Sequence, residues 1–327
     1  MKNFFFKLIL FFFSFFIPLF LVEFYLIRNQ KSPNYEIYKY KVNGVTYTFN
    51  DKPELYFNDD TSEKIIFLGD SFTFGKVCAG EKKDFVNLLK KKYKKKNNIK
   101  IFNFASRSRG PSDYLNIYKN FQQNEKNLKK LIVVLNHNDI SLNVTDCKTI
   151  EVLNRLNLYP IIKKCKKTLE TKKDRFSGTL IKSLDNFLEK TLTWQFIRTK
   201  LYSFSFLRKY YGSSNIDDLY KDNQSIEFIN YLNLLSRIQL EAKKDGVSLE
   251  FIYFNDVHYL KDDNPKSWTS FNIYANKVGI KIHDSWDYFM QHKEADNMAW
   301  SLTDHHPNCK AHEIMANYLI ENNLVVR

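Results

Sequence analysis

The sequence predicts an α/β protein with a parallel sheet of about five strands and helices on both faces of the sheet. The first observation behind this prediction is that short apolar runs, typical of buried strands, alternate with longer segments of helical periodicity. The second is that polar motifs directly follow several of these runs, which is where open α/β sheets place their active sites.

The elements follow one another from residue 38 onward. Residues 38–49 alternate in polarity around Asn43-Gly44, which predicts a β-hairpin. Apolar runs predict strands over residues 64–68, 99–104, 131–135, 248–254 and 280–283. Helical spacing of apolar residues predicts helices over residues 84–96, 111–124, 226–244, 268–277 and 310–323.

One segment, at about residues 140–225, interrupts this alternation. It lacks strand signals but has helical periodicity over 180–202, so we expect a helical insertion that covers or flanks the site. The expected organisation is a transmembrane anchor over 1–30, a hairpin-containing linker over 31–62 and a catalytic domain over 63–327.

The N-terminal segment from Phe4 to Ile27 is almost wholly apolar, with Lys7, Ser14, Pro18 and Glu23 as exceptions. This run is long enough to cross a bilayer as a helix. A cleaved signal peptide is the alternative, but its apolar stretch would be shorter and would end in small residues. We therefore expect an uncleaved, single-pass transmembrane helix that contacts membrane lipid.

The charges that flank this run do not set its orientation. Lys2 and Lys7 on one side are balanced by Arg28 and Lys31 on the other, so the positive-inside rule favours neither direction. We expect the N-terminus inside the cell and the catalytic domain outside it, in the periplasm or the extracellular space.

The formal net charge of +14 raises the question of nucleic-acid binding. No recognition motif accompanies the charge, so we expect no nucleic-acid partner. The lysines instead form runs, such as residues 90–96, on a predicted helix that also carries Phe85, Leu88 and Leu89. We interpret this run as a solvated helix face, with attraction to anionic lipid or acidic glycan as the alternative.

Three polar segments carry the chemistry. Gly-Asp-Ser occupies residues 69–71, Asn-His-Asn-Asp occupies 136–139 and Asp-His-His-Pro-Asn occupies 304–308. They supply a serine nucleophile, an amide donor for an oxyanion, and an acid with a base, which are the groups that a serine hydrolase needs. Taken alone, each segment is also compatible with a turn, a helix cap or a polar loop.

In this order the segments resemble the SGNH, or GDSL, hydrolases, and the chain looks like a membrane-anchored bacterial type. The resemblance covers residues of about 64–320 and implies a flavodoxin-like three-layer α/β/α sandwich. It implies that Ser71 is the nucleophile and that Asp304 and His306 complete a catalytic triad.

The resemblance also implies an oxyanion hole, where the sequence departs from the family pattern. Two donors are the backbone N–H of Ser71 and the side-chain amide of Asn138. The family's glycine donor aligns with Ser108, while Gly110 lies two residues later, so either residue is a candidate for the third. Asn136 replaces the glycine that begins the third segment and adds a side chain next to the hole.

The acid and the base also differ from the family in their spacing. Asp304 precedes His306 by two residues, which is shorter than the family often has. His305 is the competing base, and we favour His306 because Pro307-Asn308 follows it, as in the family. Other histidines are interpreted as surface, structural or loop residues, namely His258, His292, His312 and the His283-Asp284 pair.

Four cysteines are too few for a disulfide-built scaffold and show no zinc-site spacing, so we expect neither a metal nor a cofactor. Cys78 follows the nucleophile segment and Cys309 follows the histidine segment. These segments must meet if the triad forms, which makes a Cys78–Cys309 disulfide a specific hypothesis for an extracytoplasmic domain. The alternative is four buried or unpaired cysteines.

The function that follows is serine-dependent ester hydrolysis through an acyl-enzyme at the cell envelope, with an acylated carbohydrate or another ester as substrate. The resemblance to anchored members of the family implies a carbohydrate O-acetylesterase. Two alternatives remain: an O-acyltransferase acting on a surface polysaccharide, and a catalytically silent domain that binds glycan. An active-site serine probe separates the enzyme from the silent domain, because only the enzyme is labelled at Ser71.

Overall fold

The structure is a computed structural model, and the residues that it describes fall into separate ranges. They are 14, 17–18, 21, 25, 38–42, 44–52, 61–75, 78, 82–94, 98–124, 127–142, 220, 223, 225–255, 257, 266–292, 298–299 and 306–326. Those from 38 onward belong to one compact unit, and residues 14–25 belong to another. Most of the predicted anchor and of the predicted insertion lies outside the described residues.

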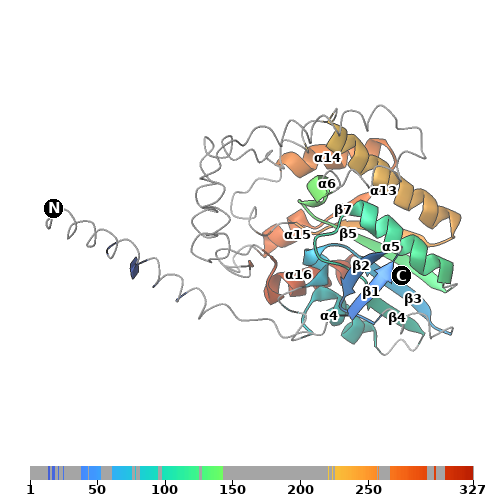
Figure 1. The fold of residues 1–327 in the computed structure, drawn as a ribbon, viewed down its shortest axis with the longest axis horizontal. Coiled ribbons are helices and arrows are strands. Elements are labelled where there is room, and N and C mark those ends of the chain that lie inside the picture. Colours follow the sequence, from blue (N-terminus) through green and yellow to red (C-terminus); the bar gives the residue numbers. More distant parts are fainter. Residues whose placement is uncertain are drawn as a thin grey trace. The chain divides into compact units, whose positions relative to one another are not determined.

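A five-stranded parallel sheet forms the centre of the larger unit (Figure 1). Its strands run in the order β4-β3-β5-β6-β7. Their bounds are Glu63–Leu68 for β3, Ile99–Asn103 for β4, Leu128–Leu135 for β5, Ser248–Tyr253 for β6 and Ile282–Asp284 for β7. The predicted parallel sheet is therefore confirmed, and the flavodoxin-like strand order places the topological switch point between β3 and β5.

Helices cover both faces of this sheet, because successive side chains of each strand point to opposite sides. In β3, Ile65 and Phe67 belong to one apolar core, and Ile66 and Leu68 belong to the other. The first core is shared with α4 (Phe85–Tyr93), α15 (Trp286–Gln291) and α16 (Cys309–Glu321). The second is shared with α5 (Pro111–Asn124), α13 (Ile226–Lys244) and α14 (Lys266–Lys277). The result is a three-layer arrangement.

The predicted hairpin is also present. Strands β1 (Tyr38–Val42) and β2 (Val45–Phe49) pair antiparallel, and Val42 lies opposite Val45. Gly44 in the connecting turn has φ +84°, a conformation that two-residue hairpin turns require and that glycine adopts without strain. Tyr47 and Phe49 are buried in the same core as α5, so the hairpin packs against the sheet domain.

The structure differs from the sequence prediction where charged side chains are buried. Strand β5 begins at Leu128 rather than at residue 131, because Lys130 is buried in the sheet beside Glu250 (Nζ to Oε1, 3.3 Å). Glu250 also contacts His283 across the neighbouring strand (3.0 Å). His283 and Asp284 thus belong to strand β7, and the prediction of a polar loop there was wrong.

Near the N-terminus, Ile17, Leu21 and Tyr25 are helical and expose 50, 60 and 64% of their surface. Within the ranges given above, the structure contains no helix that is both long enough and apolar enough to span a bilayer.

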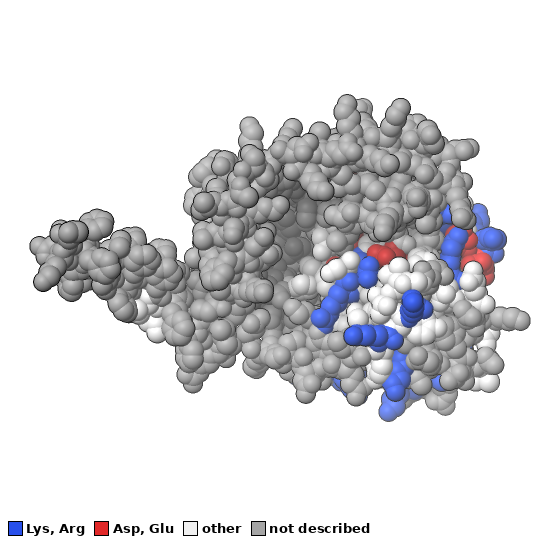
Figure 2. Space-filling view, in the orientation of Figure 1, with Lys and Arg blue, Asp and Glu red and all other residues white. Residues whose placement is uncertain are grey.

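Basic side chains are spread over the described part of the face seen in Figure 2. The predicted lysine-rich helix face is confirmed for α4, where Lys91, Lys92 and the following Lys94 are exposed. Lys90, by contrast, is half-buried and makes an ion pair with Asp51 (2.6 Å).

Candidate active site

The nucleophile segment forms a tight turn from β3 into the short helix α3 (Ser71–Phe74). Asp70 caps this helix by accepting a hydrogen bond from the N–H of Phe72 (2.8 Å). Gly69 leaves room for the turn, since a Cβ there would overlap the side chain of Thr73. The turn places Ser71 beyond the carboxyl end of β3, beside the topological switch point.

The structure brings Ser71 and His306 together. The Oγ atom of Ser71 lies 2.8 Å from Nε2 of His306 and 3.2 Å from Oδ2 of Asp70. The imidazole also packs against the ring of Phe72 (5.5 Å between centroids). Asp304 and His305 lie outside the described residues.

Two features hold His306 beside the nucleophile turn. Asn308 caps α16 by accepting hydrogen bonds from the N–H groups of Lys310 (2.9 Å) and Ala311 (3.1 Å). A disulfide joins Cys78 to Cys309, with 5.3 Å between their Cα atoms. The Cys78–Cys309 hypothesis is therefore confirmed, and this bond links the segment after Ser71 to the segment after His306.

The loop over residues 106–110, which we call the oxyanion loop, follows β4. The N–H of Ser106 donates to the carbonyl of Gly69 (3.0 Å), which ties this loop to the nucleophile turn. Ser108 is exposed and has φ +55°, a left-handed conformation that costs a non-glycine residue energy. Within the described part of the chain, the Ser108 N–H has no acceptor, whereas the N–H of Gly110 donates to Oδ2 of Asp113 (3.3 Å).

The third segment turns sharply after β5, on the other side of the switch point. Asn136 is buried, and its Oδ1 accepts a hydrogen bond from the N–H of Asn138 (2.9 Å). The carboxylate of Asp139 accepts hydrogen bonds from the Asn136 N–H and the Tyr114 hydroxyl (3.0 Å each). The added side chain of Asn136 therefore stabilises the turn that presents Asn138.

Two buried carboxyl groups lie beneath these segments. Burial raises the pKa of Asp70, and the N–H of Phe72 and the side chain of Asn136 oppose that rise. Burial raises the pKa of Asp139 further above its usual range, and the neighbouring Asp70 adds to this effect. The turn segments thus rest on polar groups that are screened from water.

His312 is a structural residue, as the sequence analysis expected. It is buried between the rings of Phe85 (5.7 Å) and Phe254 (5.7 Å), and its Nδ1 accepts the N–H of Phe85 (3.4 Å). Burial lowers the pKa of His312 to about 3, with a smaller contribution from His306, so the ring is neutral at physiological pH.

A family model described as GDSL-like Lipase/Acylhydrolase matches residues 65–319. The chain belongs to this family. The resemblance that the three polar segments indicated is thereby confirmed, and the protein is an ester-hydrolysing enzyme. The matched residues include Ser71, Ser108, Asn138 and His306, while hairpin β1–β2 lies before the match begins.

Among solved structures, this GDSL-family chain is similar to three enzymes or relatives at low identity. A member of the lipolytic protein G-D-S-L family from Veillonella parvula DSM 2008 has 13% identity and TM-score 0.39, covering 80% of this chain and 97% of its own. The acetyl xylan esterase AlAXEase has 12% identity and TM-score 0.40, with coverages of 79 and 98%. LAE5, an alpha/beta hydrolase from the metagenome of Lake Arreo, Spain, has 12% identity and TM-score 0.42, with coverages of 81 and 97%.

Superpositions of this quality carry no argument about the site. No curated protein matches the chain.

Several residues that hold the site belong to none of the three polar segments. Tyr220 is fully buried, and its hydroxyl contacts the carbonyl oxygens of Asn136 (3.3 Å) and His137 (3.1 Å). The Tyr114 hydroxyl contacts both Asp139 and the carbonyl of Arg109 (3.0 Å each), and so bridges two segments. A tyrosine on an apolar helix face looks like ordinary core in a sequence, so no local signal identifies either residue.

Proposed function

We propose that Ser71 is the nucleophile of an esterase and that His306 is its general base. The observation that carries this proposal is the 2.8 Å contact between Ser71 Oγ and His306 Nε2. A neutral serine hydroxyl is a weak nucleophile, so its proton must leave as the oxygen attacks the ester carbonyl. With Nε2 unprotonated, His306 accepts that proton and later returns it to the departing alcohol.

Asp304 is the proposed third member of the triad. A carboxylate hydrogen-bonded to Nδ1–H fixes the imidazole tautomer with Nε2 free to accept, and it stabilises the imidazolium that forms during attack. Because Asp304 precedes His306 by two residues, it is close to the ring along the chain. The order of the motifs and the family match support this assignment.

The oxyanion that forms during attack requires hydrogen-bond donors. We assign this role to the backbone N–H groups of Ser71 and Ser108 and to the side-chain amide of Asn138. The geometry favours Ser108 over Gly110, because the Gly110 N–H already donates to Asp113. Ser108 and Asn138 follow neighbours of β3 in the sheet, so both belong to the edge where Ser71 lies.

The departures from the family pattern are compatible with a working site. Ser108 adopts a left-handed backbone conformation in place of glycine, and Asn136 is buried and hydrogen-bonded within its turn. Both substitutions are accommodated while Ser71 and His306 remain in contact. This favours the esterase over a catalytically silent domain.

The proposed location is the outer face of a membrane. The Cys78–Cys309 disulfide supports an oxidising compartment, because structural disulfides are rare in the cytosol. The apolar run from Phe4 to Ile27 supports an anchor, and Ile17, Leu21 and Tyr25 present exposed apolar surface at helical spacing. An enzyme held there meets envelope polysaccharides, whose O-acetyl groups are small esters, and these are the proposed substrates.

Acyl release from purified envelope glycan tests this proposal. The wild-type protein is expected to release acetate, and Ser71→Ala is expected to release none above the rate without enzyme. Adding a second glycan as acceptor distinguishes transfer from hydrolysis, since only a transferase would move the acyl group onto it. Equal acetate release by wild type and Ser71→Ala would refute the proposed nucleophile.

A further inference from the structure

Hairpin β1–β2 lies before the family match, which begins at residue 65, yet it packs into the domain beside the oxyanion loop. Phe49 is fully buried, and its ring packs against Phe104 (5.7 Å), which immediately follows β4. On β1, Tyr40 stacks with Phe121 of α5 (6.3 Å). These contacts bring the polar side of the hairpin next to the loop that carries Ser108.

Tyr47 makes the central contact. Its hydroxyl donates to Oδ1 of Asp113 (3.1 Å) and accepts a hydrogen bond from Asn116 (3.3 Å). The second oxygen of Asp113 accepts the N–H of Gly110 (3.3 Å), so one carboxylate joins the hairpin to the oxyanion loop. Burial and the nearby Asp113 raise the pKa of Tyr47 to about 12, so the hydroxyl keeps its proton and remains a donor.

Further contacts reach the loop on both sides of Ser108. The guanidinium of Arg109 lies over the ring of Tyr47 (4.9 Å), and its Nη2 donates to the carbonyl of Thr46 (3.5 Å). The N–H of Thr48 donates to Oγ of Ser106 (3.4 Å). The hairpin therefore contacts the oxyanion loop at the residues that come shortly before and directly after Ser108.

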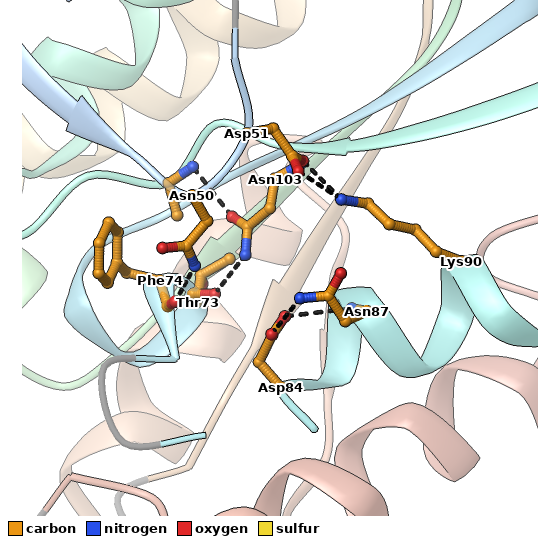
Figure 3. A network of polar contacts seen from close by, with 9 residues as sticks. Asn50, Asp51, Thr73, Phe74, Asp84, Asn87, Lys90 and Asn103 are labelled. Atoms are coloured by element: carbon orange, nitrogen blue, oxygen red, sulfur yellow. Dashed lines mark hydrogen bonds and ion pairs between the residues drawn. The ribbon is translucent and has the colours of Figure 1, made fainter. Parts of the chain in front are cut away.

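The residues after β2 extend this support to the nucleophile turn (Figure 3). The side-chain amide of Asn50 donates to the carbonyl of Phe74, in the last turn of α3. Asp51 accepts hydrogen bonds from the Asn103 N–H and from Lys90 Nζ (2.6 and 2.7 Å). One continuous segment thus contacts both the nucleophile helix and the strand that leads into the oxyanion loop.

A left-handed conformation at a non-glycine residue persists only where the surroundings impose it, and it costs of order 1–3 kcal/mol. Ser108, at φ +55°, is such a residue. Its neighbours are held by the hairpin through Ser106, Arg109 and Asp113.

We propose that hairpin β1–β2 is a positioning element of the active site and that Tyr47 is its main positioning residue. This inference rests on the proposed function. Tyr47 touches no reacting atom in this account, and it acts through Asp113 and Arg109 on the conformation of the oxyanion loop. Loss of its hydroxyl leaves the Gly110 N–H and Asp113 paired but releases them from the hairpin, so the loop samples conformations in which the Ser108 N–H is misaligned.

Tyr47→Phe tests the proposal because it removes only the hydroxyl. Tyr118→Phe is the matched control. Tyr118 is a buried tyrosine whose hydroxyl also donates to an aspartate, Asp245 (2.8 Å), but it has no described contact with the oxyanion loop. Two readouts are needed, namely kcat and KM for a soluble short-chain ester, and amide hydrogen exchange over residues 105–111.

The loss of one hydrogen bond from a positioning chain is expected to lower kcat roughly three- to ten-fold in Tyr47→Phe, with KM within about two-fold of wild type. Hydrogen exchange over residues 105–111 is expected to rise in that variant and to stay unchanged in Tyr118→Phe. Unchanged exchange in Tyr47→Phe, or the same kcat loss in both variants, would overturn the proposal. An inactive wild type would contradict the proposed function, whereas the exchange readout still decides the role of the hairpin.

Discussion

The two halves of the active site are held in place by different means. Ser71 and His306 are fixed by a helix cap on each side and by the Cys78–Cys309 disulfide, all of which lie within or beside the family's motifs. The oxyanion loop around Ser108 has no covalent link and depends on hydrogen bonds from side chains outside those motifs. Motifs thus identify the reacting atoms in both halves, but they explain the geometry of only one.

The largest expected effect breaks the first half at its base. His306→Ala is expected to lower kcat by roughly four or more orders of magnitude, since Ser71 then has no group to accept its proton. Hydrolysis of a short-chain ester measures this loss. His292→Ala, which replaces an exposed histidine, is the control and is expected to retain wild-type turnover. Wild-type activity in His306→Ala would remove the basis of the comparison.

A smaller loss is expected when the second half is broken. Asn138→Ala is expected to lower kcat by roughly 10²- to 10³-fold, equivalent to about 3 kcal/mol of transition-state stabilisation, and to leave measurable activity from the remaining donors. Asn138→Asp keeps the size of the side chain, removes its donor and adds a negative charge, so its loss should be at least as large. An Asp variant as active as wild type would contradict an oxyanion role for Asn138.

The disulfide tests whether the first half depends on its covalent link. The double variant Cys78→Ser/Cys309→Ser is expected to lose about 2–4 kcal/mol of unfolding free energy, because the unfolded chain is no longer constrained. Denaturant unfolding with and without reductant measures this change. Reductant should destabilise the wild type but should have no further effect through this pair in the double variant.

The control for that experiment uses the remaining cysteines. Cys147→Ser/Cys165→Ser leaves the disulfide intact and is expected to respond to reductant as the Cys78–Cys309 pair dictates. If reductant leaves the stability of both the wild type and this control unchanged, the disulfide does not stabilise the first half.

The smallest expected effect concerns His312, which packs behind the first half. Its folded pKa of about 3 lies below the ordinary value of 6.5, so below pH 6.5 the unfolded chain binds a proton that the folded protein does not. The stability contributed by neutral His312 is complete above pH 6.5 and is lost as the pH falls toward 3. Between pH 7 and 5 the loss is about 2 kcal/mol.

The variant His312→Gln isolates this contribution. The raised pKa values of buried Asp70 and Asp139 give an opposite pH dependence, but they do so in both proteins. The difference in unfolding free energy between wild type and His312→Gln is therefore expected to shrink as the pH falls from 7 to 5. A difference that is independent of pH would show that His312 is not buried as a neutral ring.

Most of the fold was predictable from the sequence because it rests on local patterns. Helices α5 and α13 occur over the predicted residues, and the hairpin was indicated by Asn43-Gly44. The start of β5 was missed because Lys130 is stabilised by Glu250 on a neighbouring strand, which is a contact that no local pattern reveals.

The candidate site divides in the same way. Ser71 and His306 were predicted from motifs, and their contact follows from the parallel strand order. The choice of Ser108 over Gly110 was left open, because it depends on the hydrogen bond from Gly110 to Asp113 and on a backbone angle. The support from Tyr47 was not predictable either, since it joins residues 66 positions apart to a loop outside the hairpin.

The central claim is that Ser71 is a nucleophile activated by His306, and covalent trapping tests it most directly. The wild-type protein and His306→Ala are each treated with a fluorophosphonate, and the labelled peptide is identified by mass spectrometry over a time course. The account predicts a single adduct on Ser71 that forms rapidly in the wild type and at least about a hundred-fold more slowly in His306→Ala. An adduct on another residue, or equal labelling rates in the two proteins, would contradict it.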